Sequence, residues 1–433
     1  MDAWITLLLI VALFALLGSG VWIGLALAGV AWIGMELFSS RPAGDAMAVT
    51  IWGSASSWTL TALPLFVWMG EILFRTRLSE DMFRGLAPWL ERLPGRLLHT
   101  NIIGCTIFAA VSGSSAATCA KIGKMTLPEL KARGYPEGIT VGTLAGAGTL
   151  GLLIPPSIIM IVYGVMANVS IAQLFIAGVF PGILLALLFS GYIVVWALLN
   201  PGRIPAATTK TTLAQKLNAS RHLIPVVLLI LLVLGSIYAG IATATEAAGF
   251  GVVGSLAISA VQGSLTRTTL TESMMGATRL YCMIALILAG ASFLTLAMGY
   301  IGLPRHLAEW IGGLGLTPFA LVVALMIFYI VLGCFLDGIS MVVLTMGVIL
   351  PTVEAAGIDL LWFGIFLVLV VEMAQITPPV GFNLFVLQGM TKKQITWIAK
   401  QALPMFWLMI VAVLMIWYFP QIITYLPQQM KMG

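Results

Sequence analysis

The stretch Val111-Ser-Gly-Ser-Ser-Ala-Ala-Thr118 interrupts hydrophobic sequence with a run of small and polar residues. One apolar segment later, Gly148-Thr-Leu-Gly-Leu-Leu-Ile-Pro-Pro-Ser157 again contains glycines and closes on a double proline. In a membrane, backbone that leaves the helical conformation is tolerated only where protein buries it or where it lines a wet cavity. We therefore expect the two stretches to form one half of a functional site in a chain that otherwise spans the bilayer.

The composition of the 433 residues indicates an integral membrane protein. Sixty per cent are hydrophobic and 9% are charged, which excludes a soluble globular domain. Apolar runs of about 20 residues recur along the chain, so an all-α polytopic membrane protein is expected. The net charge of +5 reflects loop lysines and arginines, so no nucleic-acid partner is expected. Met1-Asp2-Ala3 lacks a basic start, and no signal peptide is expected.

Ten segments are expected to cross the bilayer as helices: 3–17, 19–37, 51–73, 137–168, 173–199, 223–240, 243–262, 277–300, 360–390 and 403–425. The apolar segments 98–133 and 318–355 do not look like simple crossings. Ser79–Leu93 and Pro304–Gly312 mix charged and apolar residues, which is typical of helices that lie along the membrane surface.

The basic residues predict an orientation. With the N-terminus outside, 18 of the 21 lysines and arginines face the cytoplasm, and only Arg41, Arg305 and Lys431 do not. Both termini are therefore expected outside. This count does not decide whether 98–133 and 318–355 cross or turn back. His99 to Val111 spans roughly 20 Å as a helix, which is short of the hydrocarbon core, so a re-entrant hairpin is favoured there.

An internal repeat extends this interpretation to the second half of the chain. Ser112 lies 43 residues before Pro155, and Asp337 lies 41 residues before Pro378. Each half has two spans, a surface helix, a hairpin, a helix broken by Pro-Pro and a final span. Five crossings per half invert the second copy. Inverted repeats with broken helices are typical of secondary transporters, whose sites lie near the midplane.

The first half is expected to supply an ion site. Ser112, Gly113, Ser114 and Ser115 would unwind a hairpin tip, while Gly148, Thr149, Gly151 and Pro155-Pro156 would break the neighbouring helix. Freed carbonyls and hydroxyls are hard oxygen ligands suited to Na⁺, and half-helix N-termini attract anions. The alternative is that small residues merely permit close helix packing.

The second half offers the matching set: Asp337, Gly338, Ser340, Thr345, Ala374, Thr377, Pro378, Pro379, Gly381 and Asn383. An ionisable residue at membrane depth, such as Asp337, is expected to be functional. The alternative is a hairpin tip that reaches water, where an aspartate costs little. No arginine falls at either expected site.

Three other acidic residues have less specific roles. Glu372 is expected to support the second site, to carry a proton or to make a structural hydrogen bond. Glu246 follows Thr243, which favours N-terminal capping of a helix. Glu71 is expected to pair with an arginine such as Arg75. The four cysteines show no metal-like spacing, and the absence of nucleotide-binding and hydrolase motifs indicates that the protein is not an enzyme.

Several motifs resemble those of one family, the large membrane subunit (DctM-like) of TRAP transporters, or tripartite ATP-independent periplasmic transporters. The motifs are Ser112-Gly-Ser-Ser-Ala-Ala117, Ile154-Pro-Pro-Ser-Ile158, Thr243-Ala-Thr-Glu-Ala-Ala248, Leu336-Asp-Gly338 and Thr377-Pro-Pro-Val-Gly-Phe-Asn-Leu-Phe385. The resemblance covers essentially the whole chain. Ala244 stands where a proline is common in the family, and Ala374-Gln-Ile376 where Gly-Leu-Leu is common.

The resemblance implies a sodium-driven importer of organic acids, such as C4-dicarboxylates or sialic acid, in the bacterial inner membrane, with both termini periplasmic. It implies a periplasmic substrate-binding protein (P type) and a small four-helix membrane subunit (Q type), here expected as a separate chain. Family sodium ligands carry over to Ser112, Ser115, Gly151, Ile154 and Pro156 for one ion, and to Gly338, Ala374, Thr377 and Val380 for a second. Ser114, Thr118, Asp337, Ser340 and Asn383 are the expected substrate contacts.

The expected mechanism is an elevator. Residues 97–168 and 318–391 would form the mobile transport domain, and residues 1–96, 169–317 and the final helix in 392–433 the scaffold. The main alternative is proton coupling on the same architecture, with Asp337 or Glu372 as the carrier. A channel or passive scaffold is a second alternative, which the lack of a continuous polar stripe disfavours. Which organic acid is carried, how many ions move and whether the protein is a dimer stay open.

Overall fold

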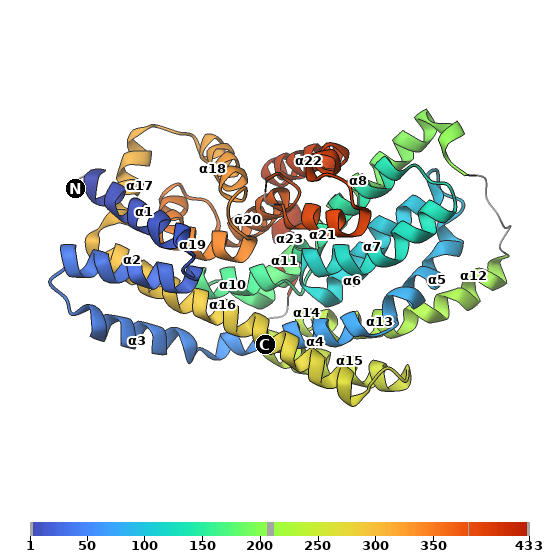
Figure 1. Ribbon diagram of the computed structural model, residues 1–433, viewed down its shortest axis with the longest axis horizontal. Helices are drawn as coiled ribbons and strands as arrows, with labels where there is room; N and C mark the ends of the chain where they lie inside the picture. The colour runs from blue at the N-terminus through green and yellow to red at the C-terminus, as the bar shows by residue number, and fades with distance from the viewer. Residues whose placement is uncertain (1–2, 206–211, 380, 431–433) are drawn as a thin grey trace.

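The computed structural model describes residues 3–205, 212–379 and 381–430, and within these ranges it contains helices and no strand (Figure 1). Six described helices are long and apolar enough to cross a membrane, or up to eight if each of two bent pairs counts as one span. The prediction of an all-helical polytopic membrane protein with broken helices is confirmed.

The first half of the chain contains eleven α-helices: α1 (Ala3–Gly18), α2 (Ile23–Phe38), α3 (Ala43–Ala55), α4 (Ala62–Arg75), α5 (Leu78–Leu90), α6 (His99–Ser112), α7 (Ser115–Ala132), α8 (Glu137–Gly148), α9 (Leu150–Leu153), α10 (Ile158–Ala167) and α11 (Ile171–Leu199). Short 3₁₀ turns, among them Trp58–Thr61 before α4 and Arg96–Leu98 before α6, join some of them.

The second half continues with α12 (Leu213–Ser220), α13 (Ile224–Ile230), a π-helical turn (Leu231–Gly235), α14 (Ser236–Tyr238), α15 (Ala244–Val261), α16 (Arg267–Ile301), α17 (Leu303–Gly313), α18 (Pro318–Leu332), α19 (Gly338–Ala355), α20 (Leu360–Gln375), α21 (Phe382–Thr391), α22 (Ile395–Tyr418) and α23 (Gln421–Gln429). The expected surface helices correspond to α5 and α17, and the expected hairpins to α6–α7 and α18–α19.

Several expected boundaries were wrong. The span expected at 51–73 begins earlier, with α3 at Ala43, and bends by 53° before Trp58–Arg75. Small and polar residues such as Gly44 and Asp45 hid this start, although an acidic residue in the first turn favours a helix N-terminus. The last expected span, 403–425, is instead two helices that separate before Pro420.

Helix lengths also differ from the expected set of crossings. Helices α1 and α2 have 16 residues each, whereas α19, expected in a hairpin, has 18. At 1.5 Å per residue these helices measure roughly 24 and 27 Å, against a hydrocarbon core of about 30 Å.

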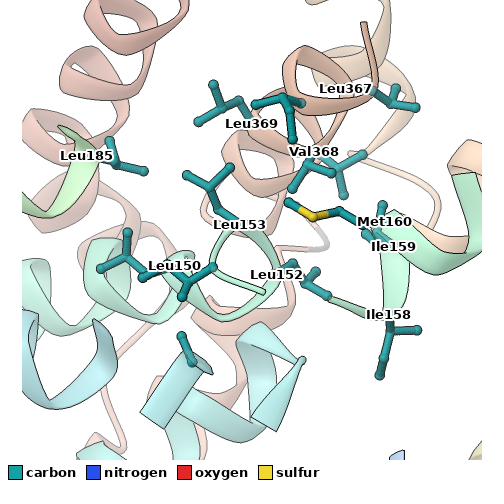
Figure 2. Packing of buried hydrophobic residues seen from close by; sticks show 14 of the residues in the cluster. Leu150, Leu152, Leu153, Ile158, Ile159, Met160, Leu185, Leu367, Val368 and Leu369 are labelled. Atoms are coloured by element: carbon teal, nitrogen blue, oxygen red, sulfur yellow. The ribbon is translucent and has the colours of Figure 1, made fainter. Parts of the chain in front are cut away.

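The core lies around α20. All of its residues from Trp362 to Gln375 are buried, which suits a helix that is apolar on every side. Helices α9, α10, α18 and α19 pack against it. Figure 2 shows Leu153 and Met160, from the two sides of the first helix break, beside the turn Leu367–Leu369 of α20. Each broken helix is therefore anchored on the other half of the chain.

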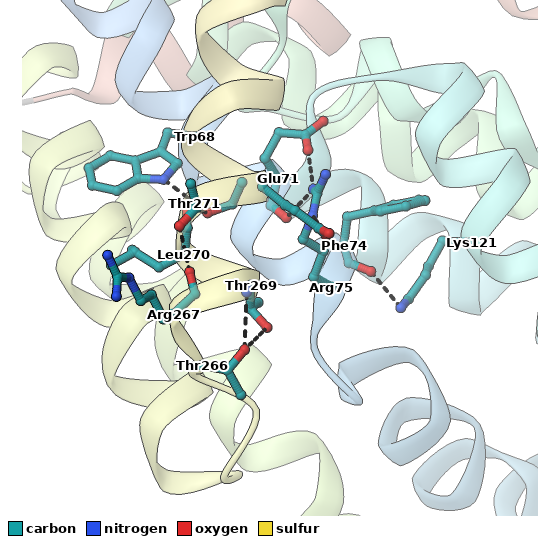
Figure 3. Close-up of polar contacts among 12 residues, drawn as sticks. Trp68, Glu71, Phe74, Arg75, Lys121, Thr266, Arg267, Thr269, Leu270 and Thr271 are labelled. Carbon is teal, nitrogen blue, oxygen red and sulfur yellow. Dashed lines mark hydrogen bonds and ion pairs between the residues drawn. The ribbon is translucent and has the colours of Figure 1, made fainter.

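The long helix α16 forms a second framework with α2, α3 and α4, and it runs beside α2 and α3 in Figure 1. Arg75 donates to the Glu71 carboxylate one turn earlier and lies 3.6 Å from the Glu272 carboxylate on α16, so the expected Glu71–Arg75 pair is confirmed (Figure 3). Trp68 Nε1 donates to Ser273 Oγ at 3.2 Å in the same interface.

The expected cap at Glu246 is also confirmed. Thr243 Oγ1 accepts a hydrogen bond from the Glu246 amide at 3.3 Å, and the Glu246 carboxylate accepts one from the Thr243 amide at 2.8 Å. This reciprocal arrangement is a capping box, which satisfies two of the amides that a helix start leaves unpaired.

Candidate functional site

The first hairpin ends where the serine-rich stretch predicts. Helix α6 stops at Ser112, Gly113 takes a left-handed conformation (φ +64°), and Ser114 caps α7 by accepting from the Ala117 amide at 3.4 Å. A glycine suits this position because a side chain is strained at positive φ. The Ser112 and Thr118 hydroxyls are buried and lie 2.6 Å apart. This hydrogen bond connects the end of α6 to the first turn of α7.

The tip of the first hairpin contacts the first helix break. Helix α9 ends at Leu153 and α10 begins at Ile158, whose amide donates to the Gly113 carbonyl at 3.4 Å. A Cβ placed on Gly151 would lie 2.6 Å from the Ser114 carbonyl oxygen, so only a glycine permits this approach. The Pro155-Pro156 bond between the two helices is cis.

The five residues expected at the first sodium site are close in space. Ser112 and Ser115 stand at the two sides of the tip, and Gly151 contacts Ser115. No hydrogen bond from any described residue reaches the carbonyl oxygens of Ile154 or Pro156. Carbonyl and hydroxyl oxygens are hard donors, which is the kind of ligand that suits Na⁺.

The second tip is organised by Asp337. Its carboxylate accepts from the amides of Ile339 (3.1 Å) and Ser340 (3.3 Å) and from the Ser340 hydroxyl, so it caps the start of α19. The Thr345 hydroxyl lies 2.7 Å from the Tyr329 hydroxyl, which links α18 to α19 away from the tip.

The second helix break lies directly under this tip. A Cβ on Gly333 would lie 2.2 Å from the Ala374 Cβ, and the Cys334 thiol donates to the Pro378 carbonyl at 3.3 Å. The carbonyls of Ala374 and Thr377 are hydrogen-bonded within the turn. The Ala374 carbonyl accepts from the Thr377 amide, and the Thr377 carbonyl accepts from the Gly381 amide, at 3.1 Å each. Val380, the remaining expected sodium ligand, lies outside the described residues.

Glu372 joins the two halves. It lies on α20 and is completely buried, and its Oε1 accepts from the Ser115 hydroxyl and from the Leu152 amide, the latter at 3.0 Å. Of the three roles expected for Glu372, the structure shows hydrogen bonding, and both hydrogen bonds go to the first site. Its Oε2 is buried and has no partner among the described residues. A carboxylate from the second half of the chain therefore hydrogen-bonds to both the hairpin tip and the helix break of the first half.

A cavity of about 880 Å³ opens where the two tips meet α2 and α16. The first residues of four helices line it: Ser115 of α7, Ile158 of α10, Gly338 of α19 and Phe382 of α21. Helix N-termini carry partial positive charge, so their convergence favours an anion.

The cavity contains only some of the expected substrate contacts. Ser114 and Asp337 are among its lining residues. Thr118 and Ser340 are fully buried beneath the tips, and their hydroxyls bond to Ser112 and Asp337. Asn383 is fully buried against α8, where its amide lies 3.5 Å from the Ala145 carbonyl.

The cavity also contains an arginine that sequence analysis had not placed at either expected site. Arg279 on α16 lines the cavity together with Cys282, and Trp22 before α2 does so too. Sequence reasoning placed Arg279 on the cytoplasmic side because it stands near the start of an apolar run. A charged residue inside a helix that spans the membrane was the available signal.

Broken helices at a central cavity, inside a bundle of membrane-spanning helices, define a polytopic membrane transporter. The family model described as "Tripartite ATP-independent periplasmic transporter, DctM component" matches residues 10–422, so the chain belongs to this family. The predicted family is thereby confirmed.

The chain is also similar to curated permease proteins and to one transporter of known structure. The chain is 31% identical over 382 residues to the C4-dicarboxylate TRAP transporter large permease protein DctM of Pseudomonas aeruginosa, covering 88% of this chain and 87% of that protein. It is 32% identical to the isethionate TRAP transporter permease protein DctMQ of Oleidesulfovibrio alaskensis (95% and 64%) and 30% identical to the sialic acid TRAP transporter permease protein SiaT of Haemophilus influenzae (86% and 60%). The fold resembles the YdaH transporter of Alcanivorax borkumensis (TM-score 0.63, 14% identity, 87% and 88% covered).

Membership of this family confirms the predicted class of protein. The protein is a multi-pass membrane permease that acts in secondary transport, and it is not an enzyme. The tripartite family implies two further components, a periplasmic binding protein and a small membrane subunit.

Proposed function

We propose that the protein imports an organic acid across the bacterial inner membrane in symport with Na⁺. The observation that carries this proposal is the cavity onto which α7, α10, α19 and α21 direct their N-termini. An anion there gains from the dipoles of α7, α10 and α21, whereas the Asp337 carboxylate already caps α19. The relatives named for C4-dicarboxylate and for sialic acid both carry substrates with a carboxylate group, which is the kind of anion proposed here.

Sodium binds at two sites below the cavity. The first uses Ser112, Ser115 and the carbonyls of Gly151, Ile154 and Pro156, and the two open carbonyls support it. The second uses Gly338, Ala374, Thr377 and Val380. Because Ser115 and Gly338 also border the cavity, an ion at either site orders the backbone that faces the substrate. Because the two sites share this backbone, sodium binding raises the affinity for substrate and substrate binding raises the affinity for sodium, as symport requires.

Transport proceeds by an elevator motion. The two halves are inverted repeats with re-entrant hairpins, and residues 97–168 with 318–391 move as one transport domain. Glu372 supports this grouping because it ties the second repeat to the first. Residues 1–96, 169–317 and the final helix in 392–433 form the scaffold, which a separate small four-helix subunit extends. Both termini face the periplasm, where the binding protein delivers substrate.

The test is uptake by proteoliposomes that contain the permease, its small membrane subunit and its binding protein. We expect accumulation to follow an inward sodium gradient and to fail with potassium in its place. Thr377→Ala and Ser112→Ala should both raise the sodium concentration needed for half-maximal uptake. Unchanged sodium dependence in both variants would contradict the two ion sites.

A second candidate is proton-coupled transport of an organic anion, and Glu372 favours it. This carboxyl group is fully buried and has one unpartnered oxygen, as a proton carrier would. A pH gradient would then drive uptake without sodium, and Glu372→Gln would abolish that drive.

A further inference from the structure

Arg279 is the one basic residue among the described residues that line the 880 Å³ cavity. It follows the first residue of α16 by 12 positions, or roughly 18 Å along the helix. Its side chain is exposed, and no hydrogen bond or ion pair joins it to any described residue. The nearby carboxylate of Glu272 is instead close to Arg75 on α4.

Placing a charged arginine in a membrane cavity costs free energy. Where no protein group pairs with the arginine, an anionic ligand can offset that cost. Its planar guanidinium can donate two parallel hydrogen bonds to a carboxylate, which gives orientation as well as affinity. The helix N-termini that also line the cavity provide only partial charges. Arg279 is therefore the full positive charge available to a substrate carboxylate.

The other lining residues restrict what the carboxylate is attached to. Asp337 is the one acidic residue in the lining, and its negative charge opposes a second carboxylate. Most of the wall is apolar, with Trp22, Ile158, Leu280, Met283, Ile287 and Phe382 among its side chains. One cation, one anion and an apolar wall match an acid with one carboxylate and an uncharged body.

We propose that Arg279 binds the substrate carboxylate and that the cavity selects organic acids with a single carboxylate and an apolar body. This inference rests on the proposed function, because it assigns the substrate class of the same cavity. Since α16 belongs to the proposed scaffold, movement of the transport domain separates Arg279 from the substrate. The contact thus exists in one conformation only.

Cys282, which lines the cavity one turn after Arg279, provides a readout that does not depend on transport. Its thiolate attacks a methanethiosulfonate reagent, a mixed disulfide forms and methanesulfinate leaves. Cys105 and Cys119 are buried, and Cys334→Ser removes the remaining partly accessible thiol while it keeps a donor to Pro378. In this background, with the small subunit present, labelling reports on the cavity alone.

The first measurement compares an anionic and a cationic methanethiosulfonate. Arg279→Gln should lower the ratio of their labelling rates at Cys282 several-fold, with a smaller effect at high salt, because a nearby fixed charge attracts the anionic reagent. Arg279→Lys should retain most of the ratio. Arg267→Gln, at the start of the same helix, is the matched control and should leave it unchanged. An unchanged ratio in Arg279→Gln would show that Arg279 does not act on the cavity.

The second measurement is protection of Cys282 by three six-carbon probes in the presence of sodium: hexanoate, hexanamide and hexanedioate. Hexanoate should protect best, the other two about tenfold less, and Arg279→Gln should weaken protection by hexanoate by about ten- to a hundredfold. Full protection by hexanoate in Arg279→Gln would overturn the role of Arg279 and leave the proposed function standing. Equal protection by hexanedioate would overturn the substrate class. If no probe protects the unmodified cavity, both the inference and the cavity as the substrate site fail.

Discussion

Glu372 accepts a hydrogen bond from Ser115, although 257 residues separate them in the chain. The same oxygen accepts from the Leu152 amide at 3.0 Å, so one buried carboxylate fixes both the start of α7 and the short helix α9. Glu372 therefore connects the two halves of the candidate site directly. A change at the second break can reach the first through α20.

Replacing Glu372 tests this bridge. Glu372→Ala leaves the buried Leu152 amide without an acceptor, and an unsatisfied buried donor costs about 1–3 kcal/mol. Glu372→Gln keeps an oxygen in place, so its stability should be closer to that of the unmodified protein. We expect a lower melting midpoint for Glu372→Ala in detergent. The control is Glu354→Ala, an exposed position on α19. Equal midpoints for Glu372→Ala and Glu354→Ala would contradict the bridge.

Lys121 connects the first hairpin to α4. Its ammonium group donates to the Phe74 carbonyl at 2.6 Å and to the Thr76 carbonyl at 3.1 Å, at the C-terminal end of α4, where a positive charge is favourable (Figure 3). Under the elevator proposal this contact joins the mobile part to the scaffold and must break during transport. Lys121→Met removes it, at a cost of about 1.5–3 kcal/mol for hydrogen bonds from a charged donor.

The expected result is faster hydrogen exchange of the α7 amides in Lys121→Met, because this conformation loses a stabilising contact. Lys124→Met is the matched control, since Lys124 lies one turn further along α7 and is exposed. Similar exchange in the two variants would show that Lys121 does not hold the hairpin in this position.

Gly151 sets the distance between the first tip and the first break. Gly151→Ala would place a methyl group 2.6 Å from the Ser114 carbonyl, and such overpacking costs about 1–3 kcal/mol. The proposed sodium ligands on either side would be pushed apart. Sodium should therefore raise the melting midpoint less in Gly151→Ala than in the unmodified protein.

Gly249→Ala on α15 is the control for that comparison, because its added methyl group meets no atom within 4 Å. It should keep the full sodium-dependent shift, and its own stability should not fall since alanine favours helix over glycine. A normal sodium shift in Gly151→Ala would remove the first ion site from the proposal.

Local chemistry was predictable from the sequence. The ends of α6 and α7 follow from Gly113 and Ser114, the cap of α15 follows from the spacing of Thr243 and Glu246, and the Glu71–Arg75 pair follows from their separation by one turn. Each of these features depends on residues within four positions of one another, so the pattern carries the geometry.

The contents of the cavity were not predictable in this way. Arg279 shares it with Ser114 and Asp337 only because α16 crosses both tips, and nothing in the sequence around Arg279 specifies that crossing. The partners of Glu372 could not be identified from the sequence for the same reason, since they belong to the opposite half of the chain. Long-range packing decided both outcomes.

The capping box at the start of α15 gives the most local test. Thr243→Ala removes the acceptor for the Glu246 amide and the hydroxyl that donates to the Glu246 carboxylate, and loss of such a cap costs about 1 kcal/mol. The amides of the first turn of α15 should then exchange several-fold faster, while those in the middle of the helix stay unchanged. Thr245→Ala is the matched control, because no hydrogen bond from the Thr245 hydroxyl to a described residue is found. Equal acceleration in the two variants would mean that helix propensity, and not the cap, controls this end of the helix.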